Sequence, residues 1–457
     1  MQRVYFIGIG GIGMSALARY FKFNGFEVAG YDLTPSPLTD ALSREGMDIH
    51  FEDDPKLIPA PFMNSEETLV VYTPAIPKDH KELLMFQNSG FEVVKRARAL
   101  GEITRMEKAL CVAGTHGKTT TSTLLAHILR SSHVDCNAFL GGISINYGSN
   151  YLLSKKSDLA VIEADEYDRS FHQLSPYMAI VTSTEADHLD IYGTPEAYIE
   201  SFAKFVSLIK PGGVLIMKKG LTLADKVKPG VSVYTYSSTE EADFYADNIR
   251  VSNGHLYFDW HRPNGLSLKD LDLGVPLRVN VENAVAALAV ASLNGVKDEE
   301  LVAAIKSFGG VERRFQRIVN NDKVVLINDY AHHPGELRAT IKSVRELYHN
   351  KRVLGIFQPH LYSRTRDFYK DFAEALSHLD ELILIDIYPA REKPIEGVSS
   401  QMIADLLPEM KIPVLPKSQL VDYVKQMTDL PDVFLILGAG DIDREVKPLA
   451  DYLNTLI

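Results

Sequence analysis

The feature that most constrains this chain is residues 110–121, which read LCVAGTHGKTTT. An apolar run that predicts a buried strand leads into glycines, a lysine and threonines, and a helical pattern over residues 122–130 follows. Glycines let the backbone curl so that its N–H groups face an anion, and the helix that follows adds its positive N-terminus. We therefore predict a phosphate-binding loop for a nucleoside triphosphate. It is a shortened variant of the common pattern, because Val112 stands where that pattern has a glycine.

The loop also predicts which side chains contact the nucleotide. Lys118 is expected to reach the β- and γ-phosphates, and the Thr119 hydroxyl is expected to take a place on Mg²⁺. The residues predicted to bind the nucleotide are Gly114, Thr115, His116, Gly117, Lys118, Thr119 and Thr120. The alternative, a coincidental Gly-Lys-Thr, is disfavoured by the strand before it and the helix after it.

Length, charge and cysteine content exclude several classes of protein. A chain of 457 residues suggests about three domains. The formal charge of −12, with no Lys/Arg run above the acidic background, argues against a nucleic-acid partner. Only Cys111 and Cys136 occur, too few for a disulfide framework, and no apolar run approaches the ~20 residues that span a bilayer. We expect a soluble, cytoplasmic protein without membrane insertion, as a monomer or a dimer.

The first segment carries a dinucleotide-type fingerprint. Residues 4–7 predict a strand that runs into GIGGIG at residues 8–13, a helical pattern follows, and a second strand ends in an acid. This pattern specifies a diphosphate on a helix N-terminus, and NAD, FAD and a UDP-sugar all fit it. A further strand, residues 68–72, ends in TPAIP, which either lines the ligand crevice or is an ordinary Pro-rich turn. The predicted ligand contacts are Gly8, Gly10, Gly11, Ile12, Gly13, Asp32, Thr73 and Ala75.

Two predicted strands in the middle segment end in acidic residues. Residues 157–162 run into EADEYD, and residues 177–182 run into STEADHLD. Parallel strands deliver such residues to the edge that also carries the phosphate loop. Glu163 and His188 are the predicted metal ligands, because carboxylate oxygen suits Mg²⁺ and imidazole can complete a neighbouring shell. The alternative is a set of solvated loop acids with a capping histidine.

The sequence pattern at the end of the middle segment differs from the alternating strands and helices before it. Asn253-Gly254 and Asn264-Gly265 lie between alternating apolar residues, which predicts hairpins with type I′ turns. Residues 279–293 then predict an alanine-rich helix with Asn280 and Asn283 on one face. These amides either recognise the edge of an adenine base or only cap the helix and pack against neighbouring residues.

The third segment begins after a boundary at residues 309–315, which contains Arg313 and Arg314. Predicted strands alternate with helices again, and three of the strands are followed by the polar clusters DYAHHP, QPHLYSRTRD and GAGD. We expect these clusters at one edge of a parallel sheet. Their arginines and histidines suit an anionic substrate, since guanidinium holds carboxylate in a fork geometry. A surface ion-pair network is the alternative.

Taken in order along essentially the whole chain, these motifs resemble the Mur ligases, the ATP-dependent amide-forming enzymes of peptidoglycan precursor synthesis. Their phosphate loop departs from the strict pattern in the same way. Within that family the motifs GIGGIGM, EADE, EADHLD, DYAHHP and QPH are similar to those of members that join L-alanine to UDP-N-acetylmuramate. The resemblance implies this reaction, with ATP and Mg²⁺, through an acyl-phosphate intermediate.

The resemblance also implies roles for individual residues. Lys118, Glu163, His188, Arg314 and Asp329 are the expected catalytic residues, and Thr119, Glu163 and His188 the expected metal ligands. Asn280, Asn283 and Arg314 join the expected ATP-binding residues, while Tyr330, His332, His360 and Arg364 are expected around the amino acid. The chain departs from the family at Val279, where histidine is frequent, and at Leu361, where arginine often follows the histidine of QPH.

The predicted fold is α/β with three domains. Residues 1–106 are expected to form a Rossmann-like UDP-sugar domain. Residues 107–310 are expected to form a P-loop-type ATPase domain with a mostly parallel sheet and a small β-hairpin region. Residues 311–457 are expected to form a Rossmann-like amino-acid domain. The alternatives are a ligase that joins a murein tripeptide to UDP-N-acetylmuramate, a folylpolyglutamate-type ligase, an NAD-dependent oxidoreductase and a non-catalytic nucleotide sensor.

Overall fold

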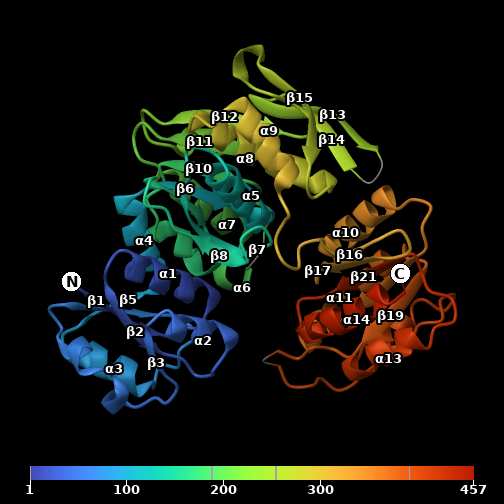
Figure 1. The fold of residues 1–457 in the computed structure, drawn as a ribbon, viewed down its shortest axis with the longest axis horizontal. Helices are drawn as coiled ribbons and strands as arrows, with labels where there is room; N and C mark the ends of the chain where they lie inside the picture. The colour runs from blue at the N-terminus through green and yellow to red at the C-terminus, as the bar shows by residue number, and fades with distance from the viewer. Residues whose placement is uncertain (1, 187–188, 253–254, 391, 457) are drawn as a thin grey trace. The chain divides into compact units, whose positions relative to one another are not determined.

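The structure, a computed structural model, describes residues 2–186, 189–252, 255–390 and 392–456 (Figure 1). It contains three β-sheets. The chain groups into two compact units: Met1–Arg250, Tyr257–Gly274 and Val279–Gly309 form the first, and Val251–Leu256, Val275–Arg278 and Gly310–Ile457 form the second. The first unit holds the first sheet and most of the second, and the second unit holds the third. The domain boundaries after residues 106 and 310 stay predictions.

The first sheet is parallel, with strand order β3-β2-β1-β4-β5. Its strands are β1 (Arg3–Ile7), β2 (Glu27–Tyr31), β3 (Asp48–His50), β4 (Thr68–Tyr72) and β5 (Glu92–Lys95). Its helices are α1 (Ile12–Phe23), α2 (Pro37–Arg44), α3 (Lys81–Asn88) and α4 (Arg96–Met106). Because β1 lies between β2 and β4, the loops that follow these three strands meet at one edge. The Rossmann-like prediction is confirmed for this sheet.

The second sheet has the order β15-β14-β13-β12-β11-β10-β6-β9-β7-β8. Its strands are β6 (Lys108–Ala113), β7 (Asn137–Ser144), β8 (Ser149–Leu152), β9 (Leu159–Glu163), β10 (Met178–Val181), β11 (Val214–Lys218), β12 (Ser232–Ser237), β13 (Phe244–Ser252), β14 (His255–His261) and β15 (Ser267–Leu273). Its helices are α5 (Lys118–Arg130), α6 (Leu189–Tyr192), α7 (Pro195–Val206), α8 (Arg278–Leu293) and α9 (Asp298–Ser307). From β12 to β7 the pairing is parallel, as predicted.

Two details of this sheet differ from the sequence prediction. Helix α5 begins at Lys118, four residues before the predicted start, because Gly117 adopts a left-handed conformation and starts the helix directly after the loop. The connection at Asn264-Gly265 has both residues at positive φ, yet it is longer than a two-residue turn: the Arg262 N–H donates to the Leu266 carbonyl. The other predicted turn, Asn253-Gly254, lies outside the described residues.

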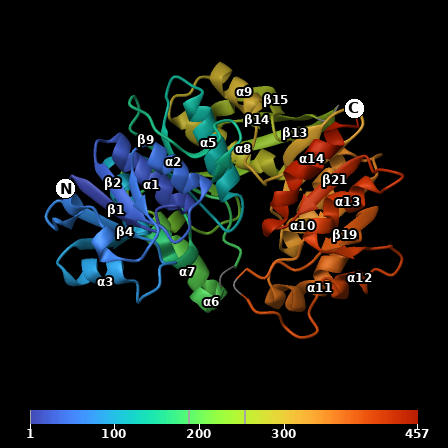
Figure 2. The ribbon, with the colours of Figure 1, turned by 60° about the horizontal axis from the view of Figure 1, so that its bottom comes forward.

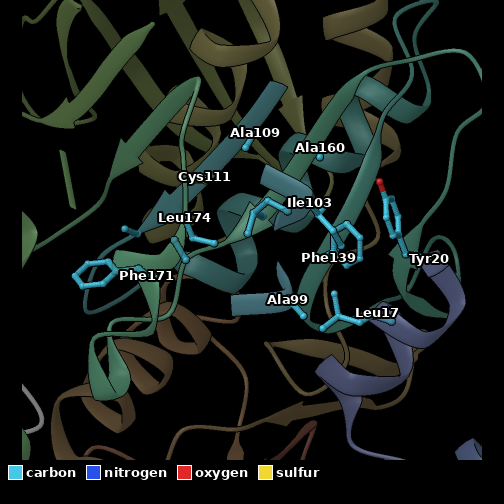
Figure 3. Close-up of a cluster of buried hydrophobic side chains, with 14 of the residues drawn as sticks. Leu17, Tyr20, Ala99, Ile103, Ala109, Cys111, Phe139, Ala160, Phe171 and Leu174 are labelled. Atoms are coloured by element: carbon cyan, nitrogen blue, oxygen red, sulfur yellow. The ribbon is translucent and has the colours of Figure 1, made fainter. Parts of the chain in front are cut away.

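One hydrophobic core connects the first sheet to the second (Figure 3). Leu17 and Tyr20 of α1 lie beside Phe139 of β7, and the Tyr20 and Phe139 ring centroids are 5.5 Å apart. Ile103 of α4 and Phe171 belong to the same cluster and are buried. This shared burial fixes the glycine loop after β1 relative to β7 and β9, because apolar contacts of this kind order both elements together.

The third sheet has the order β16-β17-β21-β18-β19-β20 and is parallel except for the β16–β17 pair. Figure 2 shows two of its strands, β19 and β21, with helices around them. Its strands are β16 (Gln316–Asn320), β17 (Val325–Asp329), β18 (Val353–Phe357), β19 (Glu381–Ile385), β20 (Val414–Leu415) and β21 (Val433–Leu437). The helices around it are α10 (Pro334–Leu347), α11 (Tyr362–Leu376), α12 (Gln401–Ala404), α13 (Leu420–Lys425) and α14 (Val446–Asn454).

Alternation along the central strands explains why helices cover both faces of the third sheet. Ile356 of β18 belongs to a core with Val424 of α13 and Leu449 of α14. The next residue, Phe357, points to the other face and packs on Phe372 of α11, with ring centroids 5.3 Å apart. Strand β17 includes Asp329, so the first residue of DYAHHP is the last residue of the strand, whereas it was predicted to follow the strand.

Two further sequence inferences can be compared with the structure. Cys111 and Cys136 are free and buried, and Cys111 lies inside β6 as predicted. Within the described part of the chain, every helix is too short or too polar to cross a bilayer.

Candidate functional site

The phosphate loop lies at the carboxyl end of β6, between two parallel neighbours. Val112 pairs with Glu163 of β9, and Ala113 pairs with Val181 of β10, so the residues after all three strands meet at one edge. The loop is held to β10, because the Thr115 N–H donates to the Ser183 carbonyl. The first intrahelical bond of α5 runs from the Thr121 N–H to the Gly117 carbonyl. The N–H groups of the three preceding residues, all in the first turn, are therefore available to an anion.

Two glycines make this loop possible. Gly114 has φ +139 and Gly117 has φ +79, which side-chain-bearing residues rarely adopt. A Cβ on Gly117 would lie 2.7 Å from Asn283 Oδ1, and a Cβ on Gly114 would collide with the Thr182 hydroxyl. The closely packed backbone is what a phosphate cradle requires, and the predicted loop is confirmed as strand, turn and helix. His116 is exposed, with Nε2 3.7 Å from a Glu185 carboxylate oxygen.

Lys118 folds back over this loop. Its ammonium donates to the Gly114 carbonyl at 2.7 Å and to the Glu166 carboxylate at 2.8 Å. The Glu166 side chain is 2% exposed, and burial raises its pKa, which the Lys118 charge opposes. Tyr192 donates to the Glu166 carbonyl at 2.5 Å, so the backbone at this acid is fixed as well. The structure therefore holds a charged pair against the loop.

Glu163 connects the loop to β7. Its Oε1 accepts a bond from the Thr119 hydroxyl at 2.9 Å, and its Oε2 accepts one from the Gly141 N–H at 2.9 Å. Burial raises the pKa of Glu163, while Lys118 and these two donors lower it. The structure thus brings Thr119 and Glu163, two of the predicted metal ligands, into contact. The third, His188, lies outside the described residues.

The two asparagines of α8 lie beside the loop. Asn283 Nδ2 donates to Asn280 Oδ1 at 3.1 Å, and the Thr121 hydroxyl donates to Asn283 Oδ1 at 3.1 Å. Both side chains are buried. The two side chains contact each other and Thr121, and their contact with adenine stays a prediction.

In the first sheet, the glycine loop is held by the acid at the end of β2. The Gly10 N–H donates to Asp32 Oδ2 at 2.7 Å. Gly8 has φ +88, and its α-carbon faces Thr73 so closely that a Cβ would lie 2.7 Å from Thr73 Cγ2. Ala75 is exposed in the same loop. The predicted residues therefore form one edge around the N-terminus of α1.

A cavity of about 290 Å³ extends from that edge to the phosphate site. Gly13 and Arg96 line it on the side of the first sheet, and Leu140, Glu163 and Asp165 line it on the side of the second. Because Glu163 also accepts a bond from Thr119, the cavity ends beside the phosphate loop. A ligand anchored at the N-terminus of α1 can thus reach the nucleotide site.

In the third sheet, Asp329 holds the turn that carries Arg314. Its carboxylate accepts bonds from the Phe315 N–H at 2.7 Å and the Ala331 N–H at 2.8 Å, and burial raises its pKa. Arg313 and Phe315 both have positive φ, so Asp329 secures an unusual turn that presents Arg314. The Arg314 guanidinium lies 5.1 Å from the Tyr330 ring centroid. Contact of Arg314 and Asp329 with the nucleotide stays a prediction.

The four residues expected around the amino acid form one cluster. Ring centroids are 5.3 Å apart for Tyr330 and His332, and 5.9 Å for His332 and His360. Arg364 Nη1 is 3.5 Å from His360 Nδ1. Burial first, and then the charge of Arg364, lower the pKa of His360 to about 4, and burial lowers the pKa of His332 as well. The pKa of both imidazoles thus lies below its usual value, and Arg364 supplies a permanent positive charge.

Comparison with known proteins places this geometry in a family. Models of three parts of the Mur ligases match in order: the "Mur ligase family, catalytic domain" at residues 3–108, the "Mur ligase middle domain" at residues 112–291, and the "Mur ligase, glutamate ligase domain" at residues 313–440. The chain belongs to the Mur ligase family.

Relatives of this Mur ligase match over its full length. It is 60% identical over 457 residues to the UDP-N-acetylmuramate–L-alanine ligase of Porphyromonas gingivalis strain W83, with 100% of both chains covered. The enzyme of that name from Parabacteroides distasonis is 58% identical, over 98% of this chain and 97% of the relative. Among solved structures, the UDP-N-acetylmuramate–alanine ligase of Thermotoga maritima matches with a TM-score of 0.80, 26% identity and 100% of both chains covered.

Several residues of the Mur ligase site were not predicted as contacts from the sequence. Arg96 lines the cavity and lies so close to Gly13 that a Cβ there would collide with its guanidinium. Glu166 holds Lys118, and Glu336 lies 3.2 Å from His332 Nδ1. Glu166 stands within the EADE motif, so a search for a counter-ion to Lys118 could have found it. Arg96 opens a helix distant in sequence from the fingerprint and gave no such signal.

We expect Gly117→Ala to weaken ADP binding by about 10-fold or more, because the new Cβ displaces Asn283 from the loop. The matched control is Gly220→Ala, since Gly220 also has positive φ but has nothing within 4 Å of its Cβ position. Both substitutions carry backbone strain of about 1–2 kcal/mol. Calorimetric titration of both variants with ADP separates the effect of the steric clash with Asn283 from the effect of backbone strain. Equal losses of affinity in the two variants would contradict this account.

Proposed function

We propose that this Mur ligase joins L-alanine to the lactyl carboxylate of UDP-N-acetylmuramate, with conversion of ATP to ADP and phosphate. The reaction is a step in peptidoglycan precursor synthesis. The choice of amino acid is supported by the full-length relatives at 58–60% identity, which are named for this ligation. The runner-up is ligation of a murein tripeptide. It is supported only by fold similarity, such as a TM-score of 0.69 at 22% identity with a murein peptide ligase of Psychrobacter arcticus.

The observation that carries the proposal is the cavity between the N-terminus of α1 and Glu163. If the diphosphate of the UDP-sugar lies on the N-terminus of α1, the lactyl carboxylate at the other end of the substrate lies some distance from that helix. The cavity directs this carboxylate toward the phosphate loop. Arg96 provides a cation on the same wall. A ligase of this class needs this juxtaposition, since the carboxylate must reach the γ-phosphate.

The residues present fit a magnesium nucleotide. Thr119 and Glu163 offer a hydroxyl and a carboxylate within 2.9 Å of each other, beside a loop whose glycines leave room for phosphate. Mg²⁺ at nucleotide sites usually takes one or two carboxylates and completes its shell with phosphate oxygens and water. Among the described residues, no group of three His, Cys, Asp or Glu side chains could hold a metal by itself. Mg²⁺ held by these residues would neutralise part of the negative charge of the phosphates.

The chain's own groups account for the chemistry as follows. A carboxylate oxygen of the sugar substrate attacks the γ-phosphorus, and the bond to ADP breaks, giving an acyl phosphate. Lys118 and the first-turn N–H groups of α5 stabilise the charge that spreads over the transferring group. The neutral amine of L-alanine attacks the acyl carbon, phosphate leaves, and the amine gives up a proton. Arg364 and the imidazoles of His332 and His360 hold the incoming amino acid.

The test is ADP release from the purified chain with UDP-N-acetylmuramate, Mg²⁺, ATP and one acceptor at a time. We expect L-alanine to give the highest kcat/KM, and glycine, L-serine and the tripeptide to give less. Preference for the tripeptide would establish the runner-up. No ADP release with any acceptor would reject the ligase assignment.

Lys118→Ala should abolish ADP release while binding of UDP-N-acetylmuramate persists. The physical reason is that Lys118 belongs to the loop after β6, whereas the diphosphate of the sugar is assigned to the glycine loop after β1. Binding is measured by calorimetry, and the buried Trp260, the chain's one tryptophan, reports folding of the first unit. Loss of UDP-sugar binding in a folded variant would put both nucleotides in one site.

Arg364→Ala should raise the KM for L-alanine far more than the KM for ATP. A lost charge-assisted contact with the carboxylate is worth about 2–3 kcal/mol, or on the order of 30- to 150-fold. Among the described residues, no carboxylate forms an ion pair with Arg364. Arg338→Ala is the matched control, because that arginine of α10 pairs with Glu374 at the surface. Equal, small changes in both KM values would mean that Arg364 only braces its loop, with His332 the next residue to test.

A further inference from the structure

The contact between Lys118 and Glu166 has a chemical consequence for nucleotide binding. An ammonium has three N–H donors. Lys118 directs them to the Gly114 carbonyl at 2.7 Å, to the Glu166 carboxylate at 2.8 Å and toward the Thr115 carbonyl at 3.4 Å. All three directions are thus engaged by the protein. A phosphate oxygen that binds Lys118 must replace one of these acceptors.

Glu166 is the acceptor that a phosphate displaces most readily. The carbonyls of Gly114 and Thr115 belong to the loop itself, and the loop is tied to β10 through the Thr115 N–H and the Ser183 carbonyl. Glu166 carries a negative charge, and a phosphate repels that charge. A phosphate can also take the place of Glu166 as the acceptor for the Lys118 ammonium. Phosphate and Glu166 therefore compete for one cation.

Glu166 remains close to the site even when it loses this contact. Its side chain is 2% exposed, so solvent does not screen it as it would a surface acid. Its carbonyl accepts a bond from Tyr192, and the Tyr198 hydroxyl lies 3.5 Å from its Oε1 while also contacting the Thr115 hydroxyl at 3.0 Å. These contacts join Glu166 and the phosphate loop to α6 and α7. The carboxylate is thus fixed in the position from which it recaptures Lys118.

We propose that Glu166 is a positioning residue that shares the Lys118 ammonium with the nucleotide phosphates and so limits how tightly ADP is retained after each turnover. This inference rests on the proposed function, in which Lys118 contacts the phosphates of ATP and ADP. It assigns to the second glutamate of EADE a role distinct from that of Glu163, which contacts Thr119. A ligase must release ADP before it can bind ATP again, and Glu166 weakens the bond that holds ADP.

The proposal predicts a gain of affinity, which general damage to a site does not produce. Glu166→Gln keeps the shape and an acceptor oxygen but removes the charge. We expect this variant to bind ADP on the order of 10-fold more tightly than the wild-type chain. The kcat should fall, because ADP leaves more slowly, and the KM for ATP should fall with it. Glu166→Asp keeps the charge, but its side chain is one methylene shorter and the charge lies farther from Lys118. Its ADP affinity should therefore lie between those of the wild-type chain and Glu166→Gln.

Calorimetric titration with ADP at fixed Mg²⁺ measures these affinities, and steady-state ADP release gives the kcat and KM. Glu240→Gln is the control, because Glu240 forms an exposed ion pair with Lys219 in the same unit and should leave ADP affinity unchanged. Trp260 fluorescence confirms that each variant is folded. If both Glu166 variants bind ADP no more tightly than the wild-type chain, the proposal is overturned.

A second comparison isolates the role of Lys118. In a Lys118→Ala background, Glu166→Gln should tighten ADP binding much less than in the wild-type chain, because no ammonium remains to be shared. An equal gain of ADP affinity in both backgrounds would overturn the proposal that Glu166 and the phosphates share Lys118. Repulsion between Glu166 and the phosphates would then explain the gain. Failure of the proposed function is distinguishable, since the wild-type chain itself would then not bind ADP.

Discussion

The Glu163 carboxylate is the interaction on which the first unit's site depends. One oxygen accepts a bond from Thr119 in the first turn of α5, and the other accepts a bond from the Gly141 N–H in β7. A half-buried carboxylate of this kind is costly to leave without hydrogen-bond donors, so the positions of α5, β7 and the end of β9 are set together. Gly141 is required at that point, because a Cβ there would collide with the carboxylate. The same acid lines the cavity, so one side chain adjoins both the loop after β6 and the cavity that leads to the N-terminus of α1.

The shared core between the first two sheets gives this arrangement its stability. The Rossmann-like sheet alone presents a glycine loop at a helix N-terminus, which by itself fits many diphosphates. Burial of Leu17 and Tyr20 of α1 against Phe139 ties that helix to the strand whose Gly141 contacts Glu163. The Asn150 side chain adds a polar contact by donating to the Ile12 carbonyl at 2.9 Å. Selectivity for a ligand that extends from one sheet to the other thus follows from packing that the glycine fingerprint does not specify.

The sequence predicted the elements of the fold better than it predicted the contacts between them. Strand and helix periods, together with glycines before helices, placed β1, β4 and β10 almost to the residue, since these signals are local. The start of α5 was missed by four residues because a threonine-rich first turn carries little hydrophobic pattern. Arg96 and Glu166 were missed as site residues for a different reason. Each acquires its role from a partner distant in sequence, Gly13 for Arg96 and Lys118 for Glu166. No signal in the sequence indicated Arg96, whereas Glu166 stands within the EADE motif and its pairing with Lys118 was overlooked.

The electrostatics of the second unit's cluster combine permanent cations with imidazoles that burial makes harder to protonate. Burial lowers the pKa of His332, and burial together with the Arg364 charge lowers the pKa of His360 to about 4. Arg364 and Arg314, which lies over the Tyr330 ring, are permanent cations, and the Glu336 carboxylate lies against His332. Groups of both signs match a zwitterion, which presents a carboxylate and an amine a few bonds apart. An unprotonated imidazole also adds no competing cation beside the incoming amine, and the amine must lose its own proton before it can attack an acyl carbon.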